Sequence, residues 1–143
     1  MKNENNLQKF HNKAIYDYSL REIWPQEVLT ESKLLSDEKI NSEDFNELPF
    51  VTIDGEDAKD FDDAIFCELI PDGFKLYVAI ADVSFYVKEN SAIDMEARAR
   101  ATSTYMFRRV LPMLPEKLSN DLCSLKEGVL RKTLIVKINF DKA

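Results

Sequence analysis

The sequence has few of the residues that build metal and disulfide frameworks. Its 143 residues include one histidine, His11, and two cysteines, Cys67 and Cys123, which form no CxxC pair. These counts exclude a zinc site made of cysteine and histidine, and the two cysteines are expected to be reduced thiols in the core. Nothing around His11 resembles the partner of a nucleophile, which argues against a Ser-His or Cys-His catalytic pair.

Long apolar runs are also missing. No stretch approaches the roughly 18 apolar residues that indicate a membrane span, and the first twenty residues contain no apolar signal core. With 45% hydrophobic and 31% charged residues, the chain has the composition of a globular protein. We therefore expect a cytoplasmic protein with no membrane partner.

The formal net charge of −7 conceals an uneven distribution. Residues 1–71 hold 7 Lys and Arg against 17 Asp and Glu, whereas residues 72–143 hold 12 against 9. An acidic chain is an unusual partner for nucleic acid, but phosphate contacts depend on local basic patches and not on the total charge. Six basic residues of the second half either face RNA or form solvated surface: Arg98, Arg100, Arg108, Arg109, Arg131 and Lys132.

The pattern of the chain predicts an α+β (mixed α/β) fold with an antiparallel-rich β-sheet and helices. Pro25 stands where a helix can begin, and Ser91 is placed as the cap of a helix over residues 95–102. Strands are expected from the β-branched and aromatic runs over residues 50–53, 64–70, 74–87 (one or two strands) and 130–140.

Smaller features complete this prediction. Pro71-Asp72-Gly73 is a hairpin turn signal between two of the expected strands. In the strand that follows, Leu76, Val78 and Ile80 are expected on one face, and residues 36–47 are expected to form a surface connection. Pro115 is expected to start a short helix.

A dense acidic cluster lies between two of the β-rich runs. Ten residues contain six acids: Asp54, Glu56, Asp57, Asp60, Asp62 and Asp63. Such carboxylates repel one another, and a hard cation such as Mg²⁺, with Mn²⁺ as an alternative, relieves that repulsion while it binds a substrate phosphate. Gly55 is expected to permit the bend that returns Asp54 towards the later aspartates.

Several interpretations of this cluster compete. An exposed acidic turn needs no function, and a calcium loop of the EF-hand type fits poorly because Ile65 stands where glycine is required. The triplet Asp60-Phe61-Asp62 is compatible with the metal-diphosphate motif of a sugar-nucleotide transferase. The remaining hypothesis is a multi-metal phosphodiester hydrolase, and spacing alone does not separate the last two.

The residues around the cluster resemble a known family. Thr52–Ala64 closely resembles the signature of the ribonuclease II/ribonuclease R family, and the likeness extends over roughly Leu48 to Phe140. Further segments that carry it are Val78–Ser84, Asp94–Arg98, Thr102–Tyr105, Pro112–Asn120 and Leu122–Leu125. The resemblance implies a processive 3′-to-5′ exoribonuclease that releases nucleoside 5′-monophosphates and binds single-stranded 3′ ends of RNA.

The resemblance also implies roles for individual residues. Asp54 and Asp63 are similar to direct magnesium ligands, Asp60 to a residue that supports the metal site, and Asp62 to the carboxylate essential for catalysis. Tyr105 resembles the aromatic residue that stacks near the 3′-terminal nucleotide.

The implied domains are a polar, helical linker segment over residues 1–47 and the N-terminal portion of the catalytic (RNB) domain over residues 48–143. Because the family's catalytic domain is considerably longer, this portion is incomplete. The alternative to an active enzyme is an inactive fragment or split-gene product that acts only with a complementing chain, the remaining part of the catalytic domain.

Overall fold

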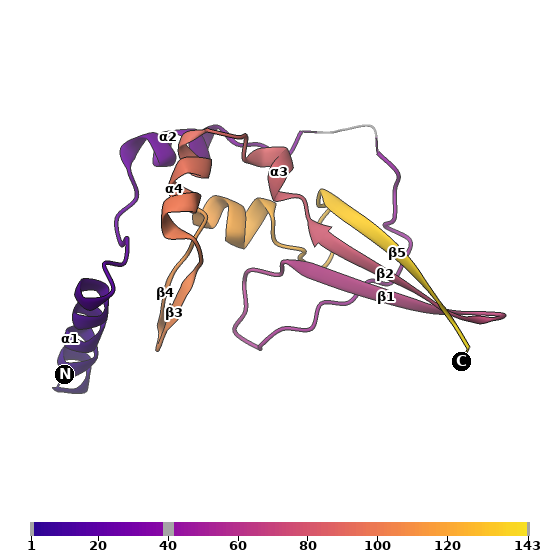
Figure 1. The fold of residues 1–143 in the computed structure, drawn as a ribbon, viewed down its shortest axis with the longest axis horizontal. Coiled ribbons are helices and arrows are strands. Elements are labelled where there is room, and N and C mark those ends of the chain that lie inside the picture. Colours follow the sequence, from indigo (N-terminus) through magenta and orange to yellow (C-terminus); the bar gives the residue numbers. More distant parts are fainter. Residues whose placement is uncertain (1, 39–41, 143) are drawn as a thin grey trace. The chain divides into compact units, whose positions relative to one another are not determined.

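The computed structural model describes residues 2–38 and 42–142, shown in Figure 1. The chain forms two compact units, each built from two separate stretches of sequence. Unit 1 comprises Met1–Leu34 and Lys88–Pro115, and unit 2 comprises Leu35–Val87 and Glu116–Ala143. Within the described ranges, no helix is both long enough and apolar enough to cross a membrane.

Unit 1 is mainly helical. It contains α1 (Lys2–Asp17), α2 (Gln26–Leu34) and α4 (Ala92–Arg100), and α2 lies against α4. Pro25 directly precedes α2, as expected of a residue with a fixed φ and no N–H to donate. The Ser91 side chain caps α4 by accepting a hydrogen bond from the Asp94 amide at 3.3 Å. The predicted helix is therefore confirmed, although it begins at Ala92 and ends at Arg100. Helix α1 lies within the segment expected to be polar and helical, although its bounds were not predicted.

A hydrogen-bonded network of charged side chains stabilises unit 1. Glu96 is almost fully buried and receives two hydrogen bonds from Arg21, at 2.8 and 2.5 Å, and one from Arg100 at 3.0 Å. The hydrogen bond from Arg21 is the main reason why the pKa of Glu96 is lowered. The Arg100 guanidinium also lies 3.5 Å from the centre of the Trp24 ring. Because breaking a buried ion pair leaves an uncompensated charge, these residues fix the helices of unit 1.

Unit 1 also contains a short hairpin that the sequence pattern did not predict. Strands β3 (Thr104–Met106) and β4 (Arg109–Leu111) pair antiparallel and are joined by Phe107 and Arg108. Arg108 has a positive φ of 58°. Two-residue turns of this kind are usually signalled by glycine or asparagine, so an arginine there gave no warning of a turn.

Unit 2 is built on an antiparallel sheet in the order β1-β2-β5 (Figure 1). The strands are β1 (Asp63–Ile70), β2 (Gly73–Ala81) and β5 (Thr133–Asp141). The predicted hairpin between β1 and β2 is confirmed by the pairing of Ile70 with Gly73. Glycine is required at that turn, since a Cβ atom on Gly73 would lie 1.7 Å from the Phe140 carbonyl oxygen. The predicted mixed fold with antiparallel pairing is thus confirmed.

Two expected strands are corrected. Residues 50–53 form no regular strand, and only Val51 makes an isolated bridge, to Ile65. The long strand expected over residues 74–87 ends at Ala81, because Asp82 caps a short helix, α3 (Val83–Tyr86), by accepting a hydrogen bond from the Phe85 amide. After Pro115 the chain turns into a short helix that includes a π-helical turn, η1 (Leu118–Leu122).

The two faces of the sheet differ in what covers them. One face carries Tyr77, Ala79 and Ala81, which are buried, and the rings of Phe45 and Phe66 lie 6.5 and 5.6 Å from that of Tyr77. Leu76, Val78 and Ile80 share the opposite face, as predicted, but that face is the open one. Its exposed apolar side chains are Leu69, Phe74, Ile80, Leu134, Val136, Ile138 and Phe140.

The segment expected to connect the first residues to the sheet is irregular. The described residues from Ser36 onwards are mostly exposed up to Glu47, and residues 39–41 of this predicted connection lie outside the described ones. The predicted domain boundary between residues 47 and 48 stays a prediction.

Candidate metal and phosphodiester site

The acidic cluster lies on a loop of unit 2 whose two ends are held together. The amide of Val51 donates to the carbonyl of Ile65 and the amide of Ile65 donates to the carbonyl of Val51, both at 2.9 Å. The bridge between Val51 and Ile65 closes residues 52–64 into a loop. Both ends of this loop therefore lie near the start of β1. Asp54 follows one side of the bridge by three residues, and Asp63 precedes the other side by two. The fold therefore returns the two ends of the cluster towards each other, as the sequence predicted.

The bend itself differs from the prediction. A turn is closed by the Ala58 amide, which donates to the Gly55 carbonyl at 2.9 Å. Gly55 is not among the described residues with a positive φ, and a Cβ atom added to it would meet nothing within 4 Å. The bend thus depends on the turn hydrogen bond and not on the conformational freedom of glycine.

The later half of the loop is fixed by backbone anchors. The Ser124 hydroxyl, which is fully buried, donates to the Lys59 carbonyl at 2.7 Å and accepts from the Phe61 amide at 3.2 Å. The Leu125 amide donates to the Phe61 carbonyl at 2.9 Å. The carbonyl of Asp62 accepts from the Ala81 amide, also at 2.9 Å. Because the backbone on both sides of each is held, Asp60 and Asp62 are preorganised before any ligand binds.

The electrostatics of the site centre on Asp62. Its pKa is raised, first because the surrounding protein removes water from its carboxyl group. Charge repulsion adds to this rise and comes from three neighbouring carboxylates, Asp60, Asp63 and Asp54. The four predicted aspartates therefore act on one another in the folded chain, and a cation among them would relieve the repulsion.

The donor chemistry of this cluster fits Mg²⁺, since carboxylate oxygens are the ligands that hard cations prefer. Asp54 and Asp63 are exposed and Asp60 is half-buried, whereas Asp62 is exposed as a residue but has a partly desolvated carboxyl group, so the cluster remains accessible. Among the described residues, however, no three His, Cys, Asp or Glu side chains are arranged closely enough to hold a metal ion.

Two residues near the cluster differ from what was expected of them, since Ser124 was given no role and Arg131 was expected to face RNA or solvent. Ser124 is the anchor described above, and Arg131 donates to the Ser124 carbonyl and to Asp121, both at 3.0 Å. The Arg131 side chain is only 10% exposed, so this ion pair supports the turn that carries Ser124. The resemblance included the segment Leu122–Leu125. It did not predict the anchoring role of Ser124, because a hydroxyl that bonds to a distant backbone segment produces no recognisable pattern in one sequence.

Cys123 confirms the expectation of a buried, inert thiol. Burial raises its pKa to about 12, and the charges of Asp62 and Asp82 add to the shift. Cys67 differs from the expectation, because it lies exposed on β1.

Tyr105, the predicted stacking residue, belongs to unit 1, whereas the four aspartates belong to unit 2. It lies on β3 and is 67% exposed. Its predicted role in stacking on RNA stays a prediction.

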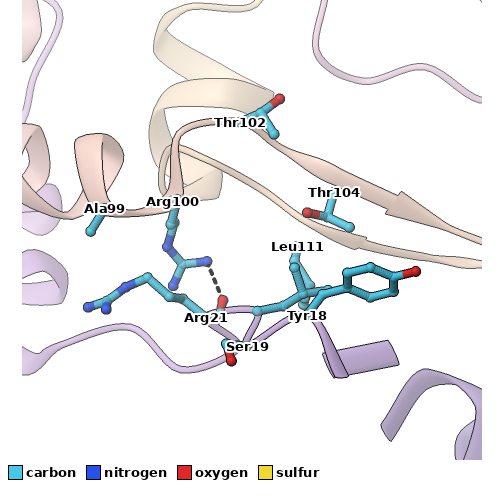
Figure 2. Close-up of a pocket in the computed structure, with 9 residues that line it drawn as sticks. Tyr18, Ser19, Arg21, Ala99, Arg100, Thr102, Thr104 and Leu111 are labelled. Atoms are coloured by element: carbon cyan, nitrogen blue, oxygen red, sulfur yellow. Dashed lines mark hydrogen bonds between the residues drawn. The ribbon is translucent and has the colours of Figure 1, made fainter. Parts of the chain in front are cut away.

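A pocket of about 140 Å³ lies in unit 1, between α4, the hairpin and residues 18–21 (Figure 2). Arg100 lines it, but its guanidinium is engaged with Glu96 and with the carbonyls of Arg21, Ile23 and Pro112. Figure 2 shows the hydrogen bond from Arg100 to the Arg21 carbonyl. Because the guanidinium already donates to these groups, it is not available to bind a ligand in the pocket. This pocket belongs to the packing of unit 1, and it contains none of the predicted site residues.

Comparison with known proteins identifies relatives. Residues 42–143 match the model of the RNB domain. The chain is 50% identical over 135 residues to ribonuclease R of Acidithiobacillus ferrooxidans, covering 91% of this chain and 31% of the relative. It is 54% identical over 123 residues to ribonuclease R of Mycoplasmopsis pulmonis, covering 82% of this chain and 17% of the relative. This chain therefore spans less than a third of the length of these relatives.

A solved structure gives the same picture. The fold is similar to that of Mycoplasma genitalium RNase R in complex with ribose-methylated single-stranded RNA, with a TM-score of 0.84 and 42% sequence identity. The likeness covers 89% of this chain and 21% of that one. Neither the EF-hand nor the sugar-nucleotide interpretation of the acidic cluster gains support from these relatives.

Proposed function

The chain belongs to the RNB-domain family of ribonuclease R relatives, and from that premise we propose that it carries the metal-binding part of a Mg²⁺-dependent 3′-to-5′ exoribonuclease. The substrate is the 3′ end of single-stranded RNA, and the products are nucleoside 5′-monophosphates. Support for RNA as the substrate comes from the solved relative, which was captured with single-stranded RNA. A cytoplasmic location is part of the same proposal.

The observation that carries this proposal is an anchored loop on which the charges of three other aspartates act on Asp62. The charges of Asp54, Asp60 and Asp63 contribute to the raised pKa of Asp62. The loop that carries Asp62 is fixed by hydrogen bonds to Ser124 and Ala81. An exposed acidic turn with no function would not require backbone anchors at Lys59, Phe61 and Asp62. Preorganised charges of this kind are what a phosphodiester hydrolase needs, because they cost no reorganisation during the reaction.

Each aspartate is assigned a role by the proposal. Asp54 and Asp63 hold Mg²⁺ directly, Asp60 supports that site, and cleavage depends on Asp62. When bound, the cation lowers the pKa of a water molecule and neutralises charge on the phosphate, with Mn²⁺ as a substitute. Tyr105 contributes a ring on which the 3′-terminal base stacks, a contact that tolerates any sequence.

Substitution of Asp62 tests the proposal. Asp62→Asn keeps the size of the side chain but removes its charge, so release of 5′-monophosphates from poly(A) in the presence of Mg²⁺ should fall at least about a hundredfold. RNA binding should persist, because the substitution removes no positive charge. The matched control is Asp57→Asn, an exposed aspartate of the same loop that has no assigned role and should keep the parent rate.

The two variants and EDTA separate the possible outcomes. Equal cleavage by Asp62→Asn and the parent would refute the proposal, as would cleavage that persists in EDTA.

A second candidate function is favoured by the open apolar face of the sheet. In this version the chain is inactive alone and acts with the remaining part of a catalytic domain, which covers that face. The chain spans 31% and 17% of the length of the two relatives. Absence of cleavage by the chain alone, with Mg²⁺-dependent cleavage restored on adding the remaining part of a relative, is the result that selects this candidate.

A further inference from the structure

The hairpin β3–β4 of unit 1 presents two aromatic side chains to solvent. Tyr105 is 67% exposed and Phe107, at the turn, is 69% exposed. Val110, which pairs with Tyr105 across the hairpin, is 47% exposed. Large apolar side chains usually gain free energy by burial, so exposed rings on one hairpin indicate a surface that binds something.

Arg108 occupies the turn at a conformational cost. Its φ of 58° lies in the left-handed region, which is unfavourable for a residue with a Cβ atom relative to glycine. Its guanidinium carbon lies 5.1 Å from the centre of the Phe107 ring, within the range of a cation–π interaction. Glycine would adopt this φ without that cost, so Arg108 is a position at which the side chain can be exchanged for glycine as a test.

The ionic state of Arg108 distinguishes it from the other basic residues that the sequence singled out. Five of the six are paired with carboxylates: Arg98, Arg100, Arg109, Arg131 and Lys132. Arg108 takes part in no ion pair in the part of the chain that the structure describes, and its side chain is exposed. Its positive charge is therefore available to an external anion.

The backbone beneath the two side chains is held in place. His11 of α1 is buried, and its Nε2 lies 3.0 Å from the Phe107 carbonyl oxygen in a hydrogen bond. Arg109, on the other side of the turn, forms an ion pair with Glu22. These contacts fix the turn while leaving the Phe107 ring and the Arg108 guanidinium in solvent. Because the turn is already ordered, binding of a ligand costs little conformational entropy.

We propose that Phe107 and Arg108 form a second contact for single-stranded RNA, in which a base stacks on the Phe107 ring and Arg108 neutralises an adjacent phosphate. The inference rests on the proposed RNA substrate and adds a subsite to it. A ring for stacking beside an unpaired cation is the combination that binds single strands without sequence preference. An apolar protein partner would be expected to meet a contiguous apolar patch, and here a charged side chain lies on the ring.

The test measures binding of a fluorescent single-stranded oligo(A) by anisotropy, in EDTA so that no cleavage occurs. Phe107→Ala should weaken binding by about tenfold, and Phe107→Tyr should restore it, because base–aromatic stacking requires only a ring. Arg108→Ala should reduce the slope of log K against log salt by about 0.7, the contribution of one phosphate contact in a single strand.

Matched variants keep the result interpretable. Arg108→Gly should lose the same salt dependence while raising the melting temperature, since glycine relieves the strained φ, so that loss of binding is not loss of folding. Phe74→Ala, which removes an exposed ring of the sheet, and Arg98→Ala, which removes an ion-paired arginine, should bind like the parent.

The outcomes separate this inference from the proposed function. Parent-like binding by Phe107→Ala overturns the inference, and the Asp62 dependence of cleavage is unaffected by that result. Unchanged RNA affinity together with a change in oligomeric state on sedimentation overturns it in favour of a protein contact. A parent chain that binds no single-stranded RNA at low salt overturns the inference and the proposed substrate together.

Discussion

The chemistry of single side chains in this protein is set by what surrounds them. Cys123 and Cys67 are the same residue type, yet one is buried beside aspartates and the other lies exposed on β1. Asp62 is likewise changed by its surroundings, since burial and the charges of neighbouring aspartates raise the pKa of its carboxyl group. Residue type alone thus does not decide reactivity, and the two thiols allow a direct check.

The two cysteines should react at very different rates with an aromatic disulfide reagent at pH 8. Because the Cys123 pKa is raised to about 12, its thiol stays protonated below that pH and is not nucleophilic, besides being inaccessible. One thiol per chain should react rapidly in buffer and two in concentrated urea. In Cys67→Ser the rapid phase should disappear, and two rapid thiols in the native parent would contradict the structure.

Contacts between elements fix the acidic loop. The loop that precedes β1 has few regular hydrogen bonds of its own, and it is held by the segment that follows η1 and by the end of β2. Ser124 satisfies two backbone groups of that loop at once, so its effect exceeds that of an ordinary surface serine.

Ser124→Ala should lower the free energy of unfolding by about 2 kcal/mol. The substitution leaves the Lys59 carbonyl and the Phe61 amide without their partner beside a buried position, and unsatisfied polar groups are costly. Urea unfolding followed by circular dichroism measures the change. Ser119→Ala is the control, because that half-buried hydroxyl of η1 bonds, within the described part of the chain, only to the neighbouring Asn120 side chain. A loss no larger than that of the control would mean that Ser124 is not an anchor.

At the scale of the whole molecule, charge and apolar surface are distributed unevenly. Much of the excess negative charge lies in the cluster of unit 2, where the proposal assigns it to a cation. The same unit exposes the apolar face of its sheet, with Leu134 58% and Val136 50% exposed. Contiguous apolar surface of this kind marks a contact with another polypeptide or a tendency to aggregate.

Substitutions on β5 distinguish the two faces of the sheet. The double variant Leu134→Thr with Val136→Thr should reduce binding of a hydrophobic fluorescent dye and increase solubility. Its melting temperature should hardly change, because exposed substitutions cost at most about 0.5 kcal/mol each and threonine suits a strand. Ile135→Thr, one residue along on the covered face, should instead cost about 1 kcal/mol and leave dye binding unchanged. Equal behaviour of the two variants would contradict the assignment of faces.

The sequence determined much of this protein by local patterns. Alternating apolar residues with a Pro-Asp-Gly turn specified the β1–β2 hairpin, Ser91 specified the start of α4, and the spacing of the aspartates with their surroundings specified the family. Each of these signals acts over a few residues, where the chain's own stereochemistry decides the outcome.

The tertiary structure decided what depends on residues far apart in sequence. Residues 50–53 have the composition of a strand, but a strand needs several consecutive backbone hydrogen bonds to a neighbour. Among these residues only Val51 pairs with another segment, through its bridge to Ile65. Ser124 anchors the acidic loop because the fold places it against residues more than sixty positions earlier in the sequence. Arg108 forms the turn of the β3–β4 hairpin, where no glycine in the sequence indicated a turn. The sequence alternation of β2 and β5 does not distinguish the two faces of the sheet. The strand register together with the exposure of the side chains shows which face is covered. Long-range contacts carry these decisions, and a local pattern does not contain them.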